Sequence, residues 1–267
     1  MEIGKRIGRG NTAEVFLLKN NENMVLKLFH KHIPHELIER EYVTSKMIRQ
    51  LGISAPNVGE LIEIEDKWGI TYERVNGNSF TQLISSQPFS IRNNAQKFAE
   101  LQLSFHGKST DQLPSQRSHL SRNIKGTELL SEKEKQIILD YLELLPEDNK
   151  VCHGDYHSDN IIMVNGETKI LDWMTGASGN PCGDIARTIL IMRDSYLPPD
   201  MPKATKFIIQ TVRKAFVKYY IKAYLRSSNL SFESIEKWFL PVMAARLVEG
   251  IPKPEKEMLV NKIRAMI

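Results

Sequence analysis

The sequence predicts an α+β protein with two parts, a small strand-rich part followed by a larger helical part. Short runs of apolar and β-branched residues dominate the first 75 residues, whereas apolar residues at three- and four-residue spacing dominate the rest. With 267 residues, of which 41% are hydrophobic, the chain is long enough for two lobes with a sizeable core. We expect the boundary at the polar stretch 76–80, and therefore one part over 1–75 and another over 76–267.

The N-terminal part is expected to form a β-sheet with one helix. Four strand-type runs separated by turn-prone polar residues cover 13–20, 23–29, 59–66 and 68–75. A helix is predicted over 34–51, because its apolar residues have helical spacing and Gly52 follows as a stop signal.

The remainder of the chain shows helical periods. The spacing of Ile91, Ala95, Phe98, Leu101 and Phe105 predicts a helix, and Ser131 with Glu134 forms a capping-box pattern that begins another, which ends at Pro146. Further helices are predicted over 204–226 and 231–249. The stretch 150–173 interrupts them as a predicted β-hairpin region.

Composition excludes several classes of protein. A net charge of +4 is too small to indicate a nucleic-acid partner. Cys152 and Cys182 form no CxxC pair and fit a reducing compartment. No apolar run approaches the ~18 residues of a membrane span, and the first residues lack a signal-peptide pattern. We therefore expect a cytoplasmic protein without membrane or nucleic-acid partners; the oligomeric state is not predicted.

A glycine-rich turn lies near the N-terminus, in IGRGNTAEVFLL (7–18). Gly8 and Gly10 are followed by strand-type sequence, whereas a Rossmann fingerprint requires a helix at this point. Glycines in a β-hairpin allow backbone N–H groups to approach phosphate oxygens closely. The segment therefore fits a phosphate-covering hairpin, and a purely structural hairpin is the alternative.

Lys27 lies in the middle of a predicted strand and shares a face with Val25. In the helix 34–51, Leu37, Glu41, Ser45 and Ile48 are predicted to face inward, where a carboxylate needs a cationic partner. Lys27 is such a partner, and a strand lysine paired with a helix glutamate positions nucleotide phosphates in kinases. The alternatives are a solvated edge-strand lysine and a solvated glutamate, and Glu39 competes with Glu41 for the role.

The most informative stretch is VCHGDYHSDNII (151–162). Asp155 precedes Asn160 by five residues, as in the HRDxxxxN loop of kinases, and Asp172 follows at the end of an apolar strand. One carboxylate and one amide oxygen, together with phosphate oxygens, suffice to bind Mg²⁺. A zinc site of His153, Asp155 and His157 is the competing interpretation, but it leaves Asn160 and Asp172 without a role.

These segments, together with YERVNG (72–77) and GDIARTI (183–189), resemble the aminoglycoside phosphotransferase family of small-molecule kinases, which is related to choline and homoserine kinases. The resemblance implies a protein-kinase-like bilobal fold, with a nucleotide-binding lobe over 1–75 and a lobe with the catalytic loop and acceptor site over 76–267. It implies ATP, with GTP as an alternative, and Mg²⁺ as cofactors, and a small-molecule hydroxyl acceptor as partner.

The resemblance also implies roles for particular residues. Asp155 would be the catalytic base, Asn160 and Asp172 would hold Mg²⁺, and Asp184 would hold the catalytic loop. The nucleotide would be bound by Gly8, Gly10, Lys27, Glu41 and backbone groups of Glu73 and Val75. His157 takes the position of a lysine in many protein kinases, where it would bind the γ-phosphate of the nucleotide or shape the loop.

Three departures separate this chain from protein kinases. Gly154 replaces the arginine that pairs with a phosphorylated activation loop, only eleven residues separate Asp172 from Asp184, and DWM stands in place of DFG. A small-molecule kinase is therefore favoured. An atypical protein Ser/Thr kinase and a non-catalytic nucleotide-binding regulator remain alternatives.

The acceptor is not predicted. Residues 201–232 contain seven Lys or Arg and no Asp or Glu, whereas a polycationic aminoglycoside calls for carboxylates. Lys214, Lys218, Lys222 and Arg226 form one basic stripe, either a solvated helix face or a wall that favours an anionic or neutral acceptor. The remaining acidic candidates are Glu233, Glu236 and Glu249.

Overall fold

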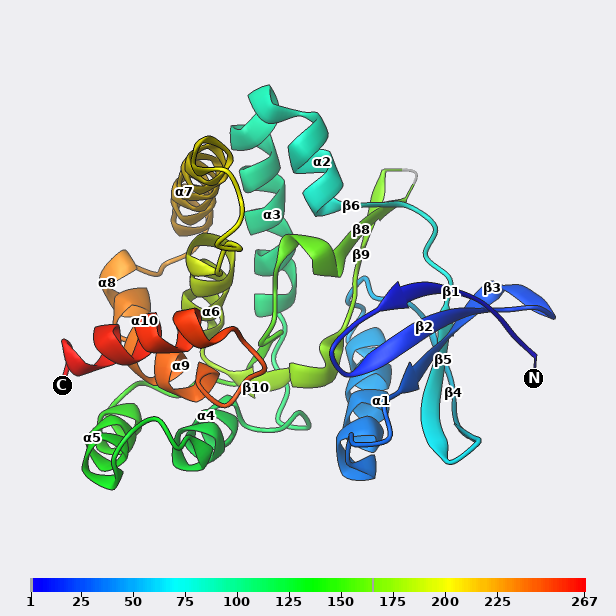
Figure 1. The fold of residues 1–267 in the computed structure, drawn as a ribbon, viewed down its shortest axis with the longest axis horizontal. Coiled ribbons are helices and arrows are strands. Elements are labelled where there is room, and N and C mark those ends of the chain that lie inside the picture. The colour runs from blue at the N-terminus through cyan, green and yellow to red at the C-terminus, as the bar shows by residue number, and fades with distance from the viewer. Residues whose placement is uncertain (1, 165) are drawn as a thin grey trace. The chain divides into compact units, whose positions relative to one another are not determined.

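The computed structural model describes residues 2–164 and 166–267, which form two compact units (Figure 1). The first unit contains the chain up to Leu83 together with Asp159–Gly176, and the second contains Ile84–Ser158 and Ala177–Ile267. The first is strand-rich and the second is mostly helical, so the predicted α+β class with a small β-rich and a larger helical lobe is confirmed. The assignment of 1–75 to nucleotide binding and 76–267 to the acceptor stays a functional prediction.

The strands are β1 (Ile3–Arg9), β2 (Ala13–Leu18), β3 (Asn21–Phe29), β4 (Val58–Ile64), β5 (Lys67–Glu73), β6 (Asn78–Ser79), β7 (Lys150–Cys152), β8 (Ile161–Val164), β9 (Glu167–Ile170) and β10 (Ala177–Gly179). The helices are α1 (His35–Gln50), α2 (Phe80–Ser86), α3 (Ile91–His106), α4 (Gln116–Gly126), α5 (Glu132–Glu143), α6 (Pro181–Asp194), α7 (Lys203–Arg226), α8 (Phe232–Glu236), α9 (Phe239–Arg246) and α10 (Lys253–Arg264). Short 3₁₀ turns are η1 (Pro88–Ser90), η2 (Ser158–Asn160) and η3 (Trp173–Thr175).

The first unit is built on an antiparallel sheet with strand order β1-β2-β3-β5-β4. Alternation along β3 gives each face of the sheet a different role. Leu26 and Leu28 pack with Leu18 in one apolar cluster. Lys27 lies on the other face, paired across the sheet with Val15 of β2 and Ile70 of β5. The predicted two-sided pattern of this strand is therefore confirmed.

Helix α1 packs on the sheet through a buried stripe that shares three of the four residues predicted for it. Ile38, Glu41, Ser45 and Ile48 are buried, whereas Leu37 is 38% exposed, so its inward assignment was wrong. Both rows span about the same arc of a helix with 3.6 residues per turn, so the period alone does not choose between Leu37 and Ile38. Glu41 lies at the centre of the buried face.

A second hairpin, β8–β9, belongs to the first unit although helices precede and follow it in the chain. The Ile170 N–H donates to the Ser54 carbonyl at 2.8 Å, and the Leu171 N–H donates to the Asn160 carbonyl at 2.8 Å. These bonds fix the end of β9, so the residue that follows, Asp172, has a defined position in this unit.

The second unit has an aromatic core between α3, α7 and the loop that follows β7. The ring of Phe98 lies 4.4 Å from that of Tyr156, 5.3 Å from that of Tyr220 and 5.4 Å from that of Phe216, measured between centroids. All four side chains are buried. The Phe98–Phe216 and Phe98–Tyr220 pairs are edge-to-face, a geometry that adds to the free energy of hydrophobic burial. The catalytic-loop candidate thus begins on a rigid base.

Several helices differ from the prediction. The single helix expected over 231–249 is wrong: α8 and α9 replace it, because Pro241 lacks the N–H of an interior residue and fits only a first helical turn. Helices α2, α4, α6 and α10 were not predicted. Asn180 before Pro181 is a cap-and-proline start signal that would have located α6.

In the part of the chain that the structure describes, no helix has both the length and the apolar character needed to cross a membrane.

Candidate active site

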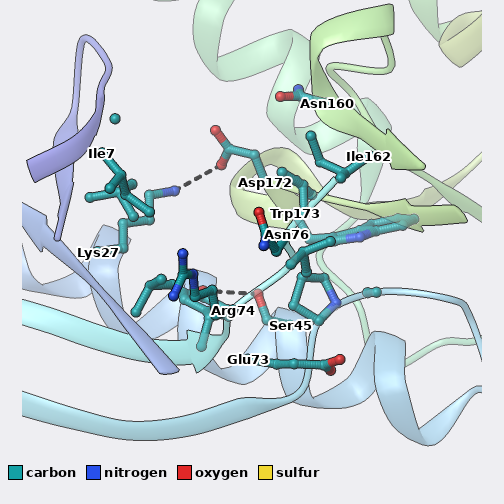
Figure 2. Close-up of a pocket in the computed structure, with 18 of the residues that line it drawn as sticks. Ile7, Lys27, Ser45, Glu73, Arg74, Asn76, Asn160, Ile162, Asp172 and Trp173 are labelled. Atoms are coloured by element: carbon teal, nitrogen blue, oxygen red, sulfur yellow. Dashed lines mark hydrogen bonds and ion pairs between the residues drawn. The ribbon is translucent and has the colours of Figure 1, made fainter. Parts of the chain in front are cut away.

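A cavity of about 490 Å³ opens within the first unit (Figure 2). Its lining comes from β1, β2 and β3, from the segment after β5, and from the chain around Asn160 and Asp172. Apolar side chains such as Val15 and Val25 form much of the wall, and polar groups are concentrated where Lys27 meets Asp172. An apolar cleft with a few convergent charged groups is typical of a ligand site.

Lys27 is held between two carboxylates at this point. Its Nζ lies 2.7 Å from Glu41 Oε1 and 3.0 Å from Asp172 Oδ1, and Figure 2 shows the second contact as a dashed line. The predicted Lys27–Glu41 ion pair is therefore present, and Glu41 is only 1% exposed. Glu39, the competing candidate, lies on the solvent side of α1 and approaches His35 at 3.9 Å.

Tyr72 and Ser45 complete this arrangement. The sequence placed Ser45 on the inward face of its helix without a role, and it gave no role to Tyr72. The Tyr72 hydroxyl donates to Glu41 Oε1 at 3.0 Å and lies 3.3 Å from Ser45 Oγ. Burial raises the pKa of Tyr72 well above its usual value, so the hydroxyl stays protonated and donates. Burial alone would lower the pKa of Lys27, but Asp172 and Glu41 outweigh it and raise that pKa, so the ammonium stays charged.

The two glycines of the N-terminal turn have different surroundings. Gly8 lines the cavity beside Val15. Gly10 lies beyond the end of β1, where its N–H donates to the Ala13 carbonyl at 2.8 Å and closes the hairpin. Both glycines belong to the predicted hairpin between β1 and β2.

The end of β5 and the residues after it form another wall of the cavity. Glu73, the last residue of β5, and Val75 both line it. The Glu73 N–H donates to the Asn57 carbonyl at 2.8 Å, and its carboxylate accepts from the Asn57 N–H at 2.9 Å. These reciprocal bonds fix the segment against β4, so the backbone around Val75 is presented to the cavity from a firm support.

Asn160 and Asp172 line the same cavity and supply oxygen atoms to it. Asp172 has a left-handed backbone, with φ 58° and ψ 66°, and its side chain caps no N–H of η3 although it precedes that turn. Such a conformation is costly for a non-glycine residue and is concentrated at functional sites. A carboxylate and an amide oxygen fit a Mg²⁺ ion that also binds phosphate oxygens.

The zinc interpretation gains no support from the described residues. Among them, no group of three or more His, Cys, Asp or Glu side chains has the arrangement of a metal site. His153 is fully buried, and its Nδ1 accepts the backbone N–H of Asp155 at 3.2 Å, so this ring braces the loop.

Asp155 lies in the second unit and is held from two sides. Arg187 Nη2 is 3.3 Å from Asp155 Oδ1, and His157 Nε2 is 3.5 Å from Asp155 Oδ2. Burial by itself would raise the pKa of Asp155, but the hydrogen bond from His157 and the charge of Arg187 outweigh it and lower that pKa. Sequence reasoning missed Arg187, although it lies three residues after the singled-out Asp184.

The loop before Asp155 is held by Asp184, as the resemblance implied. Asp184 Oδ1 accepts the Gly154 N–H at 2.6 Å, and Oδ2 accepts from His106 Nε2 at 2.9 Å and Gln102 Nε2 at 3.1 Å. Gly154 has φ +75°, a conformation that glycine adopts without strain. The glycine that replaces the protein-kinase arginine therefore has a backbone role of its own.

The basic stripe of α7 faces solvent. Lys214, Lys218, Lys222 and Arg226 are all exposed, whereas Phe216 and Tyr220 are among the residues that bury the opposite face of the helix. The stripe is therefore a solvated helix face in this unit, and it gives no reason to expect an anionic acceptor.

The fold and these side chains define a protein-kinase-like α+β protein with a largely apolar cavity around a buried Lys27–Glu41 ion pair and a separately braced aspartate loop. The sequence pattern of the phosphotransferase enzyme family matches residues 3–226, which is most of the chain. The chain belongs to this family.

Solved structures of other proteins have the same fold as this chain. A thermostable mutant of aminoglycoside phosphotransferase APH(4)-Ia superposes with a TM-score of 0.68 at 14% identity, covering 100% of this chain and 94% of that one. The amicoumacin kinase hAmiN gives 0.61 at 14% identity, covering 97% and 86%. Choline kinase from Cryptosporidium parvum Iowa II gives 0.58 at 15% identity, covering 99% and 88%. No curated protein sequence matches the chain closely enough to count as a relative.

Proposed function

We propose that this protein is an ATP-dependent phosphotransferase, with GTP as an alternative donor, that moves the γ-phosphate to a hydroxyl group of a small molecule. The observation that carries the proposal is the group of Lys27, Glu41, Asp172 and Asn160 in one cavity. Phosphoryl transfer depends on positioning and charge neutralisation, for which one fixed cation and oxygen ligands for Mg²⁺ are suited.

In this proposal, Lys27 holds the α- and β-phosphates, and Glu41 and Tyr72 keep its ammonium in place. The hairpin with Gly8 and Gly10 covers the phosphates, and the backbone of Glu73 and Val75 binds the base. Asn160 and Asp172 would hold Mg²⁺, which supplies charge neutralisation on the transferred group when bound.

In this proposal, Asp155 is the general base for the acceptor hydroxyl. Its carboxylate accepts the proton of the acceptor hydroxyl while the hydroxyl oxygen forms a bond to the γ-phosphorus and the bond to the leaving ADP oxygen breaks. His157, beside Asp155, would contact the γ-phosphate or shape the loop. Among proteins of the same fold, a mutant of APH(4)-Ia forms a ternary complex with ADP and hygromycin B, which supports a nucleotide and a small molecule as joint ligands.

The two alternatives are weaker. A protein kinase controlled by loop phosphorylation would use an arginine at the position of Gly154, and that glycine adopts a positive φ instead. A non-catalytic regulator would not need Asp155, Asn160 and Asp172 together with the Lys27 ion pair. Fold kinship identifies a reaction type better than a substrate, so the acceptor is proposed only as a hydroxyl-bearing small molecule.

A transfer screen tests the proposal. The purified chain is incubated with Mg²⁺ and ATP or GTP, with hygromycin B, choline, simple sugars or a generic protein substrate as acceptor. We expect nucleotide consumption to depend on one small molecule, which gains one phosphoryl group by mass spectrometry. Phosphorylation of protein alone would support the atypical protein kinase.

Nucleotide binding provides the accompanying readout. At a nucleotide concentration one hundred times its Kd, linkage predicts about 2.7 kcal/mol of stabilisation, which is visible as a higher Tm. A raised Tm without transfer to any acceptor would favour the regulator, and no change in Tm would contradict the nucleotide site itself.

A further inference from the structure

An arginine lies directly against the proposed base, on a helix that the catalytic loop does not contain. Arg187 is in α6, its side chain is 15% exposed, and its Nη2 lies 3.3 Å from Asp155 Oδ1. Gly154 shows that the loop's own arginine is missing, so Arg187 brings a guanidinium to Asp155 from a different element.

The Arg187 guanidinium is also held by a row of charged side chains that begins at Glu249. Arg187 Nη1 lies 2.6 Å from Glu249 Oε1, and Glu249 Oε2 lies 2.8 Å from Arg246 Nη1. Arg246 also donates through Nε at 3.1 Å and Nη2 at 2.9 Å to Glu255 Oε1 in α10. Acidic and basic groups thus alternate from Asp155 to Glu255, and each charge in the row has an opposite charge beside it. A row of this kind limits the rotamers open to Arg187.

The two contacts of Arg187 differ in length, which indicates that Arg187 binds Glu249 more strongly than Asp155. The 2.6 Å contact to Glu249 is a strong charge-assisted bond, whereas 3.3 Å to Asp155 is longer than an optimal N–H···O bond. The Asp155 side chain is 33% exposed, so a ligand can still approach its carboxylate. A distant but fixed cation favours the ionised carboxylate without occupying all of its acceptor capacity.

We propose that Arg187 is a positioning residue of the phosphotransfer reaction, which, anchored by Glu249, keeps the Asp155 carboxylate ionised and oriented to accept the proton of the acceptor hydroxyl. The inference rests on the proposed function. The titratable groups that face Asp155 in the second unit are His153 and His157 from its own loop, together with Arg187, on which Glu249 and Asp184 also act. Loss of the guanidinium removes the cation on one side of the carboxylate, and His157 remains on the other.

The test compares Arg187→Gln, Arg187→Lys and Glu249→Gln with the wild-type protein. Arg193→Gln is the matched control, because Arg193 is also on α6 and also pairs with an aspartate, Asp194 at 2.9 Å. The rate of phosphate transfer, or of MgATP hydrolysis to water, is measured against pH. The Asp155 side-chain carboxyl is titrated by carbon-13 NMR in the same variants.

For Arg187→Gln we expect kcat to fall roughly ten- to one-hundredfold with little change in nucleotide Kd. The acid limb of the kcat/KM profile and the Asp155 titration should both move up by about one pH unit or more, since an opposite charge has been removed. Arg187→Lys should restore part of the lost kcat and part of the wild-type Asp155 titration. Glu249→Gln should move the Asp155 titration in the same direction by less, and Arg193→Gln should leave it unchanged.

An unchanged acid limb and an unchanged Asp155 titration in Arg187→Gln would overturn the inference. If that variant does not fold, Arg187→Lys and Glu249→Gln provide the test, because both nearly retain the volume of the native side chains. An unchanged acid limb and Asp155 titration in both would overturn the inference. The NMR titration needs no turnover. Suppose that the wild-type protein transfers no phosphate but the Asp155 titration still moves in Arg187→Gln. That result would contradict the proposed function and would still establish the coupling of Arg187 to Asp155.

Discussion

At the scale of single residues, the candidate site is defined by carboxylates that are each matched to a cation or an N–H donor. Glu41 meets Lys27, Asp155 meets Arg187 and His157, and Asp184 accepts from Gly154 and His106. A buried charge without such a partner would cost several kcal/mol. The partners therefore determine which acidic residues of the chain are available for chemistry at neutral pH.

The first prediction concerns Asp155. Asp155→Asn should abolish phosphate transfer, a loss of about 10²-fold or more, because the amide cannot accept the hydroxyl proton. Nucleotide Kd, measured by calorimetry, should change little, since the cavity proposed for the nucleotide belongs to the first unit, whereas Asp155 belongs to the second. Near wild-type turnover in this variant would show that Asp155 is not the base.

The second prediction uses two glutamates of α1. Glu41→Gln should weaken nucleotide binding and lower the rate by roughly tenfold or more, because Lys27 loses its 2.7 Å partner and retains only Asp172. Glu39→Gln on the exposed side of the same helix is the control and should leave both unchanged. Equal effects of the two substitutions in a steady-state assay would exclude a special role for Glu41.

At the scale of secondary-structure elements, strand alternation and helical periodicity direct the side chains of the site to one face. The alternation of β3 directs Lys27 to the cavity face, and the period of α1 directs Glu41 to the same place. Outside the residues that line the cavity, α5 begins with a full capping box, in which the Glu134 N–H donates to Ser131 Oγ at 3.3 Å and the Ser131 N–H donates to Glu134 Oε2 at 2.7 Å.

The third prediction tests that cap. Ser131→Ala should lower the free energy of unfolding by about 1 kcal/mol, the usual cost of an N-cap serine. Urea denaturation at neutral pH measures the loss, and phosphate transfer should be unaffected because α5 contributes nothing to the described cavity. A change of less than a few tenths of a kcal/mol would mean that the Glu134–Arg264 contact, at 2.7 Å, holds this end of α5 without the serine.

At the scale of the whole molecule, acid should weaken the fold. Asp155, Asp184 and Asp194 all have a lowered pKa: burial opposes the shift in each case, and hydrogen bonds and cationic partners outweigh it. A carboxylate whose folded-state pKa lies below its unfolded value stabilises the protein above the unfolded value, near pH 4, and loses that contribution as the pH falls. The helical unit, which contains all three, should therefore be the acid-sensitive part.

The fourth prediction follows from these shifts. The Tm, followed by circular dichroism, should be nearly constant from about pH 7 to pH 5 and should fall steeply below about pH 4. Asp184→Asn should lower the Tm at pH 7 and flatten the fall, because the most buried of the three carboxylates is gone. The control is Asp200→Asn, at an exposed position. A Tm that is independent of pH down to about pH 3 would contradict the assignment.

Much of the fold followed from local patterns. The strand pattern of β3, helix α1, the cap of α5 and the helical stripe of α3 depend on residues close together in the chain, and the structure contains each of them. The prediction of one helix over 231–249 failed because apolar spacing was given more weight than Pro241. The inward assignment of Leu37 failed because the helical period places Leu37 and Ile38 almost equally close to the inward face, and packing buries Ile38 instead.

The sequence by itself determined the residue types of the site and their order along the chain: a strand lysine, a helix glutamate, and the aspartates and asparagine of the loop and the following strand. Only the tertiary structure decided which of these meet. It selected Glu41 rather than Glu39 for Lys27, added Tyr72 to that pair, and brought Arg187 to Asp155. The physical reason is that periodicity fixes the face on which a side chain lies, whereas the partner across a buried contact comes from a distant segment that packing alone brings into place.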